Sequence, residues 1–144
     1  MQHADVPYLV LFGWSFLAAT VLPLGSEPAV VLMIRQEYPF GAVVTLATIG
    51  NFFGACTTYA LGRGAARTLV QRETASRSRQ SKRATDTVVR YGAPALLLSW
   101  VPLIGDAIVA AAGLARMPFW PFAGWTMVGK AARYVLVAWG ALAW

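Results

Sequence analysis

Two matching stretches decide the fold: VLPLGSEP at residues 21–28 and WVPLIGDA at residues 100–107. In each, Pro and Gly break an apolar run, and an acid and a second apolar run follow. The acids Glu27 and Asp106 stand 79 residues apart (106 − 27 = 79), as do Pro23 and Pro102 (102 − 23 = 79). The same offset continues without a gap from residue 12 to residue 144. The pattern indicates an internal duplication of one structural unit.

Composition indicates an integral membrane protein with a single domain, residues 1–144. Apolar residues make up 58% of the chain and charged residues 12%, below the roughly 25% that is typical of soluble domains. The net charge of +6 would suit nucleic acid, but eight of the twelve basic residues lie between residues 63 and 90. No aromatic platform accompanies that stretch, so we expect no nucleic-acid partner. The single cysteine excludes a disulfide framework within the chain.

The first apolar run, residues 7–22, is too short to cross a bilayer. Its 16 residues would cover ~24 Å as a helix, against a hydrocarbon core of ~30 Å. Pro23 and Gly25 then break the run, and Pro28 is well placed as the first residue of a second short helix. Two half-length helices joined by a turn predict a re-entrant hairpin, which returns to the side from which it entered. The alternative, one kinked spanning helix, would carry Glu27 near its middle.

Two longer apolar segments, residues 40–61 and 119–144, are predicted to cross the membrane. The first has 22 residues and no charge, which is enough to span with some tilt. Gly50 and Gly54 are spaced for close approach of another helix, as small residues commonly are in membranes. The duplication places Gly129 opposite Gly50 (129 − 50 = 79). All three glycines are predicted to pack helices together.

One crossing in each repeat requires repeat two, residues 91–144, to be inverted relative to repeat one, residues 7–62. The basic connector at residues 63–90 is predicted to be helical and, by the positive-inside rule, cytoplasmic. The predicted fold is therefore an all-α integral membrane protein, an inverted repeat of a re-entrant hairpin plus a transmembrane helix. Transporters use this plan, with the substrate site between the repeats.

Four charged side chains and one amide fall inside the predicted membrane zone. Glu27 and Asp106 lie at the hairpin tips, and Pro102 and Gly105 precede Asp106 in the second turn. Lys130 and Arg133 lie in the middle of the second span, three residues apart and therefore on one helix face. Asn51 lies in the first span, in register with Lys130 (130 − 51 = 79). The four charges cancel as a set, whereas a single charge in hydrocarbon would be costly.

These charges have two interpretations. In the structural one, the acids cap the second half-helices and form ion pairs that only hold the fold together. In the functional one, which we favour, they line a water-accessible cavity in which Lys130 and Arg133 attract an anion such as phosphate. Partly desolvated acids would then take up protons near neutral pH and couple proton movement to substrate movement. The predicted site consists of Glu27, Asp106, Lys130, Arg133 and Asn51.

The motifs resemble the small YqaA-like branch of the DedA family, the membrane domain also called SNARE-associated or VTT. They are LP at residues 22–23, SE at 26–27, GN at 50–51, SWVPLIGD at 99–106 and GKAARY at 129–134. The resemblance covers nearly the whole chain. It implies paired re-entrant hairpins, a bacterial inner-membrane location, and lipid translocation linked to the proton-motive force. Membrane lipids are the implied partners, with undecaprenyl phosphate or another anionic phospholipid as the substrate.

The resemblance also carries one residue role and one departure. An essential acid in the first hairpin of better-known family members corresponds to Glu27. The main branch has an Arg-containing segment in its second hairpin, where this chain has WVPLIGD at residues 100–106 and no Arg. Lys130 and Arg133 would supply the missing positive charge.

No enzyme signature accompanies these features. The sequence has no Ser/His/Asp set, no metal-spaced His/Cys cluster and no phosphate-binding loop, so we predict neither catalysis nor a cofactor or metal. We predict a small membrane transporter or lipid flippase that moves an anionic substrate with protons. Because one chain has few helices to enclose a pathway, the prediction is compatible with a homo-oligomer. The alternative function is a non-transporting membrane scaffold or assembly factor that binds partners through the face carrying Gly50 and Gly54.

Overall fold

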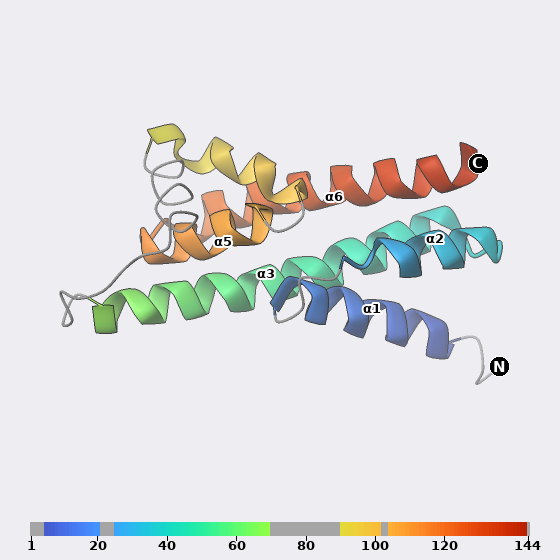
Figure 1. The fold of residues 1–144 in the computed structure, drawn as a ribbon, viewed down its shortest axis with the longest axis horizontal. Helices are drawn as coiled ribbons and strands as arrows, with labels where there is room; N and C mark the ends of the chain where they lie inside the picture. Colours follow the sequence, from blue (N-terminus) through green and yellow to red (C-terminus); the bar gives the residue numbers. More distant parts are fainter. Residues whose placement is uncertain (1–4, 21–24, 70–89, 102–103, 144) are drawn as a thin grey trace.

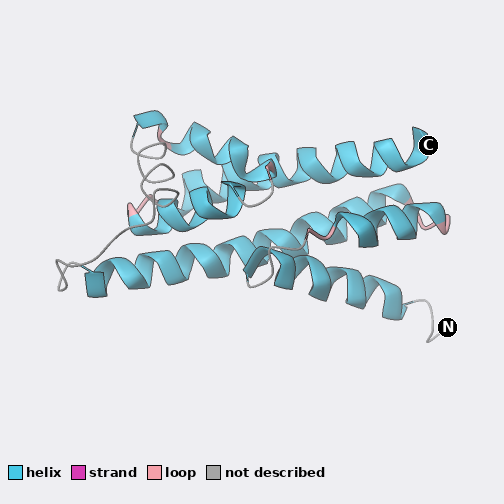
Figure 2. Ribbon diagram, viewed as in Figure 1, coloured by secondary structure: helices cyan, strands magenta, loops and turns pink. Residues whose placement is uncertain are grey.

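A computed structural model describes residues 5–20, 25–69, 90–101 and 104–143, and this part of the chain is helical without any strand (Figure 2). The elements are α1 (Asp5–Thr20), α2 (Glu27–Arg35), α3 (Phe40–Leu69), the 3-10 helix η1 (Ala93–Trp100), α5 (Ile104–Leu114) and α6 (Phe119–Ala143). The predicted all-α class is confirmed. Pro23, Pro102 and most of the predicted connector lie outside the described residues.

The helices form two hairpins beside two long helices (Figure 1). Helix α1 runs from the N-terminal end to the middle of the molecule and α2 runs back, while η1 and α5 do the same from the opposite end. The first limb of each hairpin packs on the long helix of its own half, α1 on α3 and η1 on α6. The second limbs cross over, so that α2 packs mainly on α6 and α5 packs on α3. Each half of the chain is therefore held by the other.

The turns that lead into the two long helices have the same backbone structure at matching positions. Glu37 and Arg116, which are 79 residues apart (116 − 37 = 79), both adopt the left-handed conformation, with φ of 62° and 54°. The same backbone hydrogen bond closes both turns: Tyr38 N–H to Met33 O at 3.1 Å and Met117 N–H to Ala112 O at 3.0 Å. This geometry is a common way to end a helix. The sequence duplication is thus repeated in the backbone at these turns.

Two helix boundaries differ from the prediction. Helix α2 begins at Glu27, so Pro28 is its second residue rather than its first. Helix α3 continues from the predicted end at Leu61 to Leu69. The continuation is rich in Ala and Arg, which favour helix, and contains no proline to stop it. The predicted connector therefore begins as an extension of the first long helix.

Within the described residues, one helix is long and apolar enough to cross a membrane. That segment is Phe40–Ala66 in α3, with 27 residues and a mean hydropathy of 1.5. Helix α6 has 25 residues, but Lys130 and Arg133 in its middle make it less apolar. The crossing by α6 stays a prediction.

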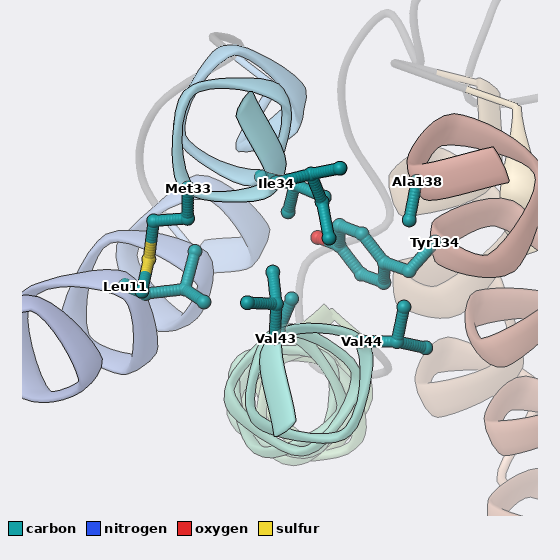
Figure 3. Close-up of a cluster of buried hydrophobic side chains, with 9 residues drawn as sticks. Leu11, Met33, Ile34, Val43, Val44, Tyr134 and Ala138 are labelled. Atoms are coloured by element: carbon teal, nitrogen blue, oxygen red, sulfur yellow. The ribbon is translucent and has the colours of Figure 1, made fainter. Parts of the chain in front are cut away.

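Two buried apolar clusters lie on either side of a polar centre. One contains Val43, Val44 and Ala47 of α3 and joins all four of α1, α2, α3 and α6. Figure 3 labels its members Leu11, Met33, Ile34, Val43, Val44, Tyr134 and Ala138. The other contains Ala55 and Tyr59 of α3 with residues of η1, α5 and α6. Asn51 falls between the two clusters along α3, and Lys130 and Arg133 fall between them along α6. Apolar packing thus fixes both ends of the polar centre.

Candidate functional site

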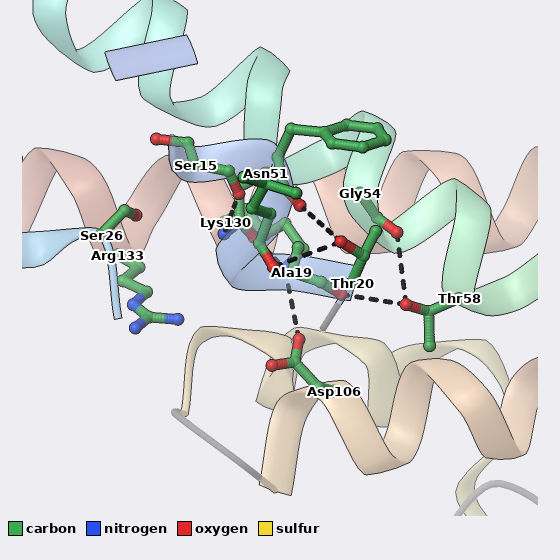
Figure 4. A network of polar contacts seen from close by, with 12 residues as sticks. Ser15, Ala19, Thr20, Ser26, Asn51, Gly54, Thr58, Asp106, Lys130 and Arg133 are labelled. Carbon is green, nitrogen blue, oxygen red and sulfur yellow. Dashed lines mark hydrogen bonds and ion pairs between the residues drawn. The ribbon is translucent and has the colours of Figure 1, made fainter. Parts of the chain in front are cut away.

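Helix α6 supplies two buried cations, and each hairpin supplies an acid to one of them. The Arg133 guanidinium forms an ion pair with the carboxylate of Glu27, the first residue of α2. The Nζ atom of Lys130 lies 3.8 Å from Oδ1 of Asp106 in the first turn of α5 (Figure 4). The structure therefore brings together all four charged residues that the sequence singled out.

The cations are covered, whereas the acids keep part of their surface. The Lys130 and Arg133 side chains are 0% and 9% exposed, against 36% for Asp106 and 27% for Glu27. A buried cation without a partner would be strongly destabilising. The two ion pairs therefore contribute to stability, whatever other role they have. Within the described ranges, no group of three or more His, Cys, Asp or Glu side chains could hold a metal ion.

Asn51 links the second ion pair to the rest of the fold. The Lys130 ammonium donates a hydrogen bond to Oδ1 of Asn51. The amide of Asn51 donates in turn to the carbonyl of Ser15 at 3.2 Å (Figure 4). Helices α6, α3 and α1 are thereby connected through one amide, which is itself buried. Lys130, which the duplication places in register with Asn51, is therefore also a hydrogen-bond partner of Asn51.

Sequence reasoning missed a second bond beside the Glu27–Arg133 pair. The hydroxyls of Ser26 and Tyr134, each next in sequence to one member of the pair, form a buried hydrogen bond. Both residues are 0% exposed. The start of α2 is therefore attached to α6 at two successive residues. The sequence signal was weak, because a Ser and a Tyr in an apolar run do not stand out as charges do.

The predicted packing glycines lie where helix backbones meet. A Cβ atom on Gly50 would lie 2.6 Å from the Phe12 carbonyl oxygen, and one on Gly54 would lie 2.5 Å from that of Phe16. Gly129 packs against η1, where an added Cβ would lie 3.0 Å from the Leu97 carbonyl oxygen. The face carrying Gly50 and Gly54 is thus covered by α1. The scaffold alternative required that face to be open to partners.

The described turn residues have different surroundings. Gly25 lies against the carboxylate of Glu27. Gly105 lies against the backbone of Ser99, where an added Cβ would be 2.5 Å from the carbonyl oxygen. Ser26 occupies the N-cap position of α2 but makes no side-chain capping bond. Both predicted capping acids have partners on α6 instead.

A cavity opens beside Glu27. Its volume is about 620 Å³, and it is lined by Trp14, Gly25, Glu27, Pro28, Ala29 and Leu32. Among the described residues of this lining, Glu27 is the one charged member and the others are apolar. The cavity thus places an open, apolar space directly against the first ion pair.

Comparison with known proteins identifies the family. The VTT domain matches residues 6–141. The chain belongs to the VTT domain (DedA) family. It is 42% identical over 130 residues to the inner membrane protein YqaA of Escherichia coli, covering 89% of this chain and 86% of that protein. It is 35% identical over 133 residues to an uncharacterized protein of Haemophilus influenzae, covering 87% and 81%. No solved structure matches the chain.

These relatives confirm the resemblance and the location. As a VTT-domain protein related to an inner membrane protein, and with α3 long enough to span, the chain is an inner membrane protein. The predicted cytoplasmic side of residues 63–90 stays a prediction, and residues 70–89 lie outside the described part.

Proposed function

We propose that this VTT-domain protein is a small membrane transporter or lipid flippase of DedA type. It moves an anionic substrate, a lipid phosphate, together with protons through a mid-membrane site between two inverted repeats. One observation carries the proposal: a single helix holds two buried cations, each paired with an acid from a different hairpin. Ionisable groups at membrane depth are costly and commonly mark a transport path.

Three observations support the inverted repeat of re-entrant hairpins. The two hairpins reach the middle of the molecule from opposite ends (Figure 1). Their second limbs exchange partners, α2 packing on α6 and α5 on α3. The matching left-handed residues Glu37 and Arg116 end both second limbs in the same way. If α3 crosses the membrane once, the hairpins enter from opposite faces and their tips meet at mid-depth.

The chemistry of the cations favours a phosphate-bearing substrate. The planar guanidinium of Arg133 presents a fork of donors that matches phosphate oxygens, and Lys130 adds a point charge three residues away. In this structure both cations are occupied by carboxylates. An anion must therefore replace an acid at its cation before it can bind.

Protonation provides that exchange. A proton on Glu27 removes the negative charge that holds Arg133 and leaves the guanidinium free for a phosphate. Return of the ion pair expels the anion as the proton leaves. Proton and anion then move together, because neither the acid nor the cation is stable alone at this depth.

The test is translocation of a fluorescent lipid phosphate in vesicles that contain the purified full-length protein and carry an imposed pH gradient. We expect the wild type to move the lipid faster than protein-free vesicles, and the Glu27→Gln variant to lose this activity while staying folded in the membrane. Glu37→Gln is the matched control, because Glu37 is an exposed acid in the turn after α2. Wild-type vesicles that move no lipid, or full activity in Glu27→Gln, would contradict the proposal.

A further inference from the structure

The cavity beside Glu27 arises because the two limbs of hairpin one separate. Helices α1 and α2 pack on α3 and α6 rather than closely on each other, whereas η1 and α5 pack directly together. The space left between α1 and α2 is about 620 Å³, within the ~300–1,000 Å³ usual for small-molecule sites. We call it the tail groove, defined by Trp14, Gly25, Glu27, Pro28, Ala29 and Leu32.

The groove opens to the outside of the helix bundle, and its walls are exposed there. Two of its large wall residues, Trp14 and Leu32, are 42% and 57% exposed. In a membrane protein, an exposed apolar wall of this kind faces hydrocarbon. Apolar walls offer water no hydrogen-bond partners, whereas an alkyl chain can occupy the groove without losing any hydrogen bond. The occupant that fits is therefore a hydrocarbon chain.

The charged end of the groove indicates which kind of lipid head group accompanies the hydrocarbon chain. Glu27 is the one charged residue among the described residues of the lining, and its carboxylate is paired with Arg133. A lipid with its tail along Trp14 and Leu32 can therefore bring its head group to this ion pair. Displacement of Glu27 leaves the Arg133 cation facing that head group, so charge complementarity selects an anionic one.

We propose that the tail groove binds the hydrocarbon chain of an anionic lipid, which enters sideways from the bilayer between α1 and α2 with its head group at Glu27 and Arg133. The role of the head group rests on the proposed function, whereas the tail site does not. Hairpin two is packed differently: η1 and α5 lie directly against each other, and α5 is held against α3 by close backbone contact at Gly62 and Gly113.

The test uses phosphatidic acid with a photoactivatable diazirine in its acyl chain, added to vesicles that contain the full-length protein. After irradiation, peptide mass spectrometry locates the labelled residues. We expect labelling on the groove residues of α1 and α2. Leu32→Trp, which fills the groove from an exposed position, should lower that labelling by about tenfold, equivalent to roughly 1.4 kcal/mol.

The matched control is Leu136→Trp. Leu136 lies on α6 outside the groove and is 54% exposed, close to the 57% of Leu32. It should leave groove labelling unchanged. Equal labelling in wild type and Leu32→Trp would overturn the proposal, as would labelling spread evenly over all exposed helices.

A second lipid separates specific binding from the surrounding bilayer. Diacylglycerol with the same diazirine chain lacks the phosphate and should label the groove less than phosphatidic acid does. Equal labelling by both lipids would mean that the groove holds a surrounding lipid only, which overturns the inference.

A transport arm keeps this inference separate from the proposed function. Groove labelling without any lipid movement in the wild type would support the tail site and contradict the proposed transport. Movement of a short-chain, water-soluble phosphate ester as fast as phosphatidic acid, without groove labelling, would support anion transport and overturn the tail site.

Discussion

The two hairpins offer one acid each to the same helix, but their second limbs, α2 and α5, are held in different ways. Hairpin two is fixed by backbone contact: Cβ atoms on Gly113 and Gly62 would lie 2.2 Å from the Tyr59 and 2.5 Å from the Ala110 carbonyl oxygen. Its cation, Lys130, is fully buried and has Asn51 as a second partner. In hairpin one, α1 is held by similar backbone contact at Gly50 and Gly54, whereas α2 is held by side chains, and an open groove lies beside its ion pair.

This difference suggests that the two hairpins have different roles, which we call the division of labour. Hairpin two has little room to move, because its glycines pack closely and Lys130 is held by two partners, Asp106 and Asn51. The second limb of hairpin one, α2, is attached through the Glu27–Arg133 pair and the Ser26–Tyr134 hydrogen bond, which can open without moving a backbone contact. We infer that hairpin two anchors the structure and that hairpin one works on the substrate. Variants of the two halves should therefore fail in different assays.

The largest effect on stability is expected from Asp106→Asn. The substitution leaves the fully buried Lys130 without its charge partner, at a cost of about 3–5 kcal/mol in the free energy of unfolding. Denaturant unfolding in detergent measures it. The double variant Asp106→Asn/Lys130→Met removes both charges and should recover most of the loss. An Asp106→Asn protein as stable as the wild type would show that this pair is no anchor.

The largest effect on transport is expected from Glu27→Gln. Loss of the titrating acid should lower the translocation rate by about a hundredfold, or roughly 2.7 kcal/mol in activation free energy. Its cost in stability should be smaller than that of Asp106→Asn, because Arg133 keeps its contact with the Tyr134 ring at 5.9 Å and is 9% exposed, whereas Lys130 is 0% exposed. Parallel transport and unfolding assays on both variants check this. The reverse ranking would exchange the roles of the two hairpins.

Glycine substitution tests the packing of hairpin two. Gly113→Ala should destabilise the protein by about 1–3 kcal/mol, because the new methyl group forces α5 away from α3. Gly124→Ala is the matched control on α6: nothing lies within 4 Å of its added Cβ, and helix propensity alone would favour it by up to about 1 kcal/mol. Thermal unfolding compares the two variants. Equal melting temperatures would contradict close packing as the anchor.

The smallest effect is expected from Tyr134→Phe. It removes the bond between Tyr134 and Ser26 but keeps the ring, at a cost of about 0.5–1.5 kcal/mol in unfolding free energy. The Ser26→Ala variant and the double variant complete a mutant cycle, which isolates the coupling between the two hydroxyls. A coupling energy near zero would mean that this bond does not hold hairpin one.

The sequence predicts the parts that depend on periodicity and charge. Ionisable groups in an apolar chain must find partners, so the pattern of charge is enough to single out Glu27, Asp106, Lys130 and Arg133. The offset of 79 residues (130 − 51 = 79) also matches Asn51 to the residue that it contacts. The all-α class follows from the same apolar pattern.

The rest depends on three-dimensional packing that local sequence does not record. Which acid pairs with which cation depends on where the start of each second limb, α2 or α5, meets α6. The Ser26–Tyr134 bond joins residues 108 positions apart, and a hydroxyl in an apolar run gives no sign of its partner. Residues 63–69 are predicted to be helical as part of the connector, but their continuity with the first long helix is not predicted, because the change from apolar to basic residues suggests a boundary there.

One measurement tests the division of labour most directly: electron paramagnetic resonance distances in two doubly spin-labelled proteins, each with Cys56 replaced by Ala. One carries labels at Arg35 and Leu136 to report on α2 against α6, and the other at Leu61 and Ala115 to report on α3 against the end of α5; all four sites are exposed. On addition of phosphatidic acid, the first distance should shift and the second should stay constant. A shift in the second distance, or no shift in either, would contradict the account.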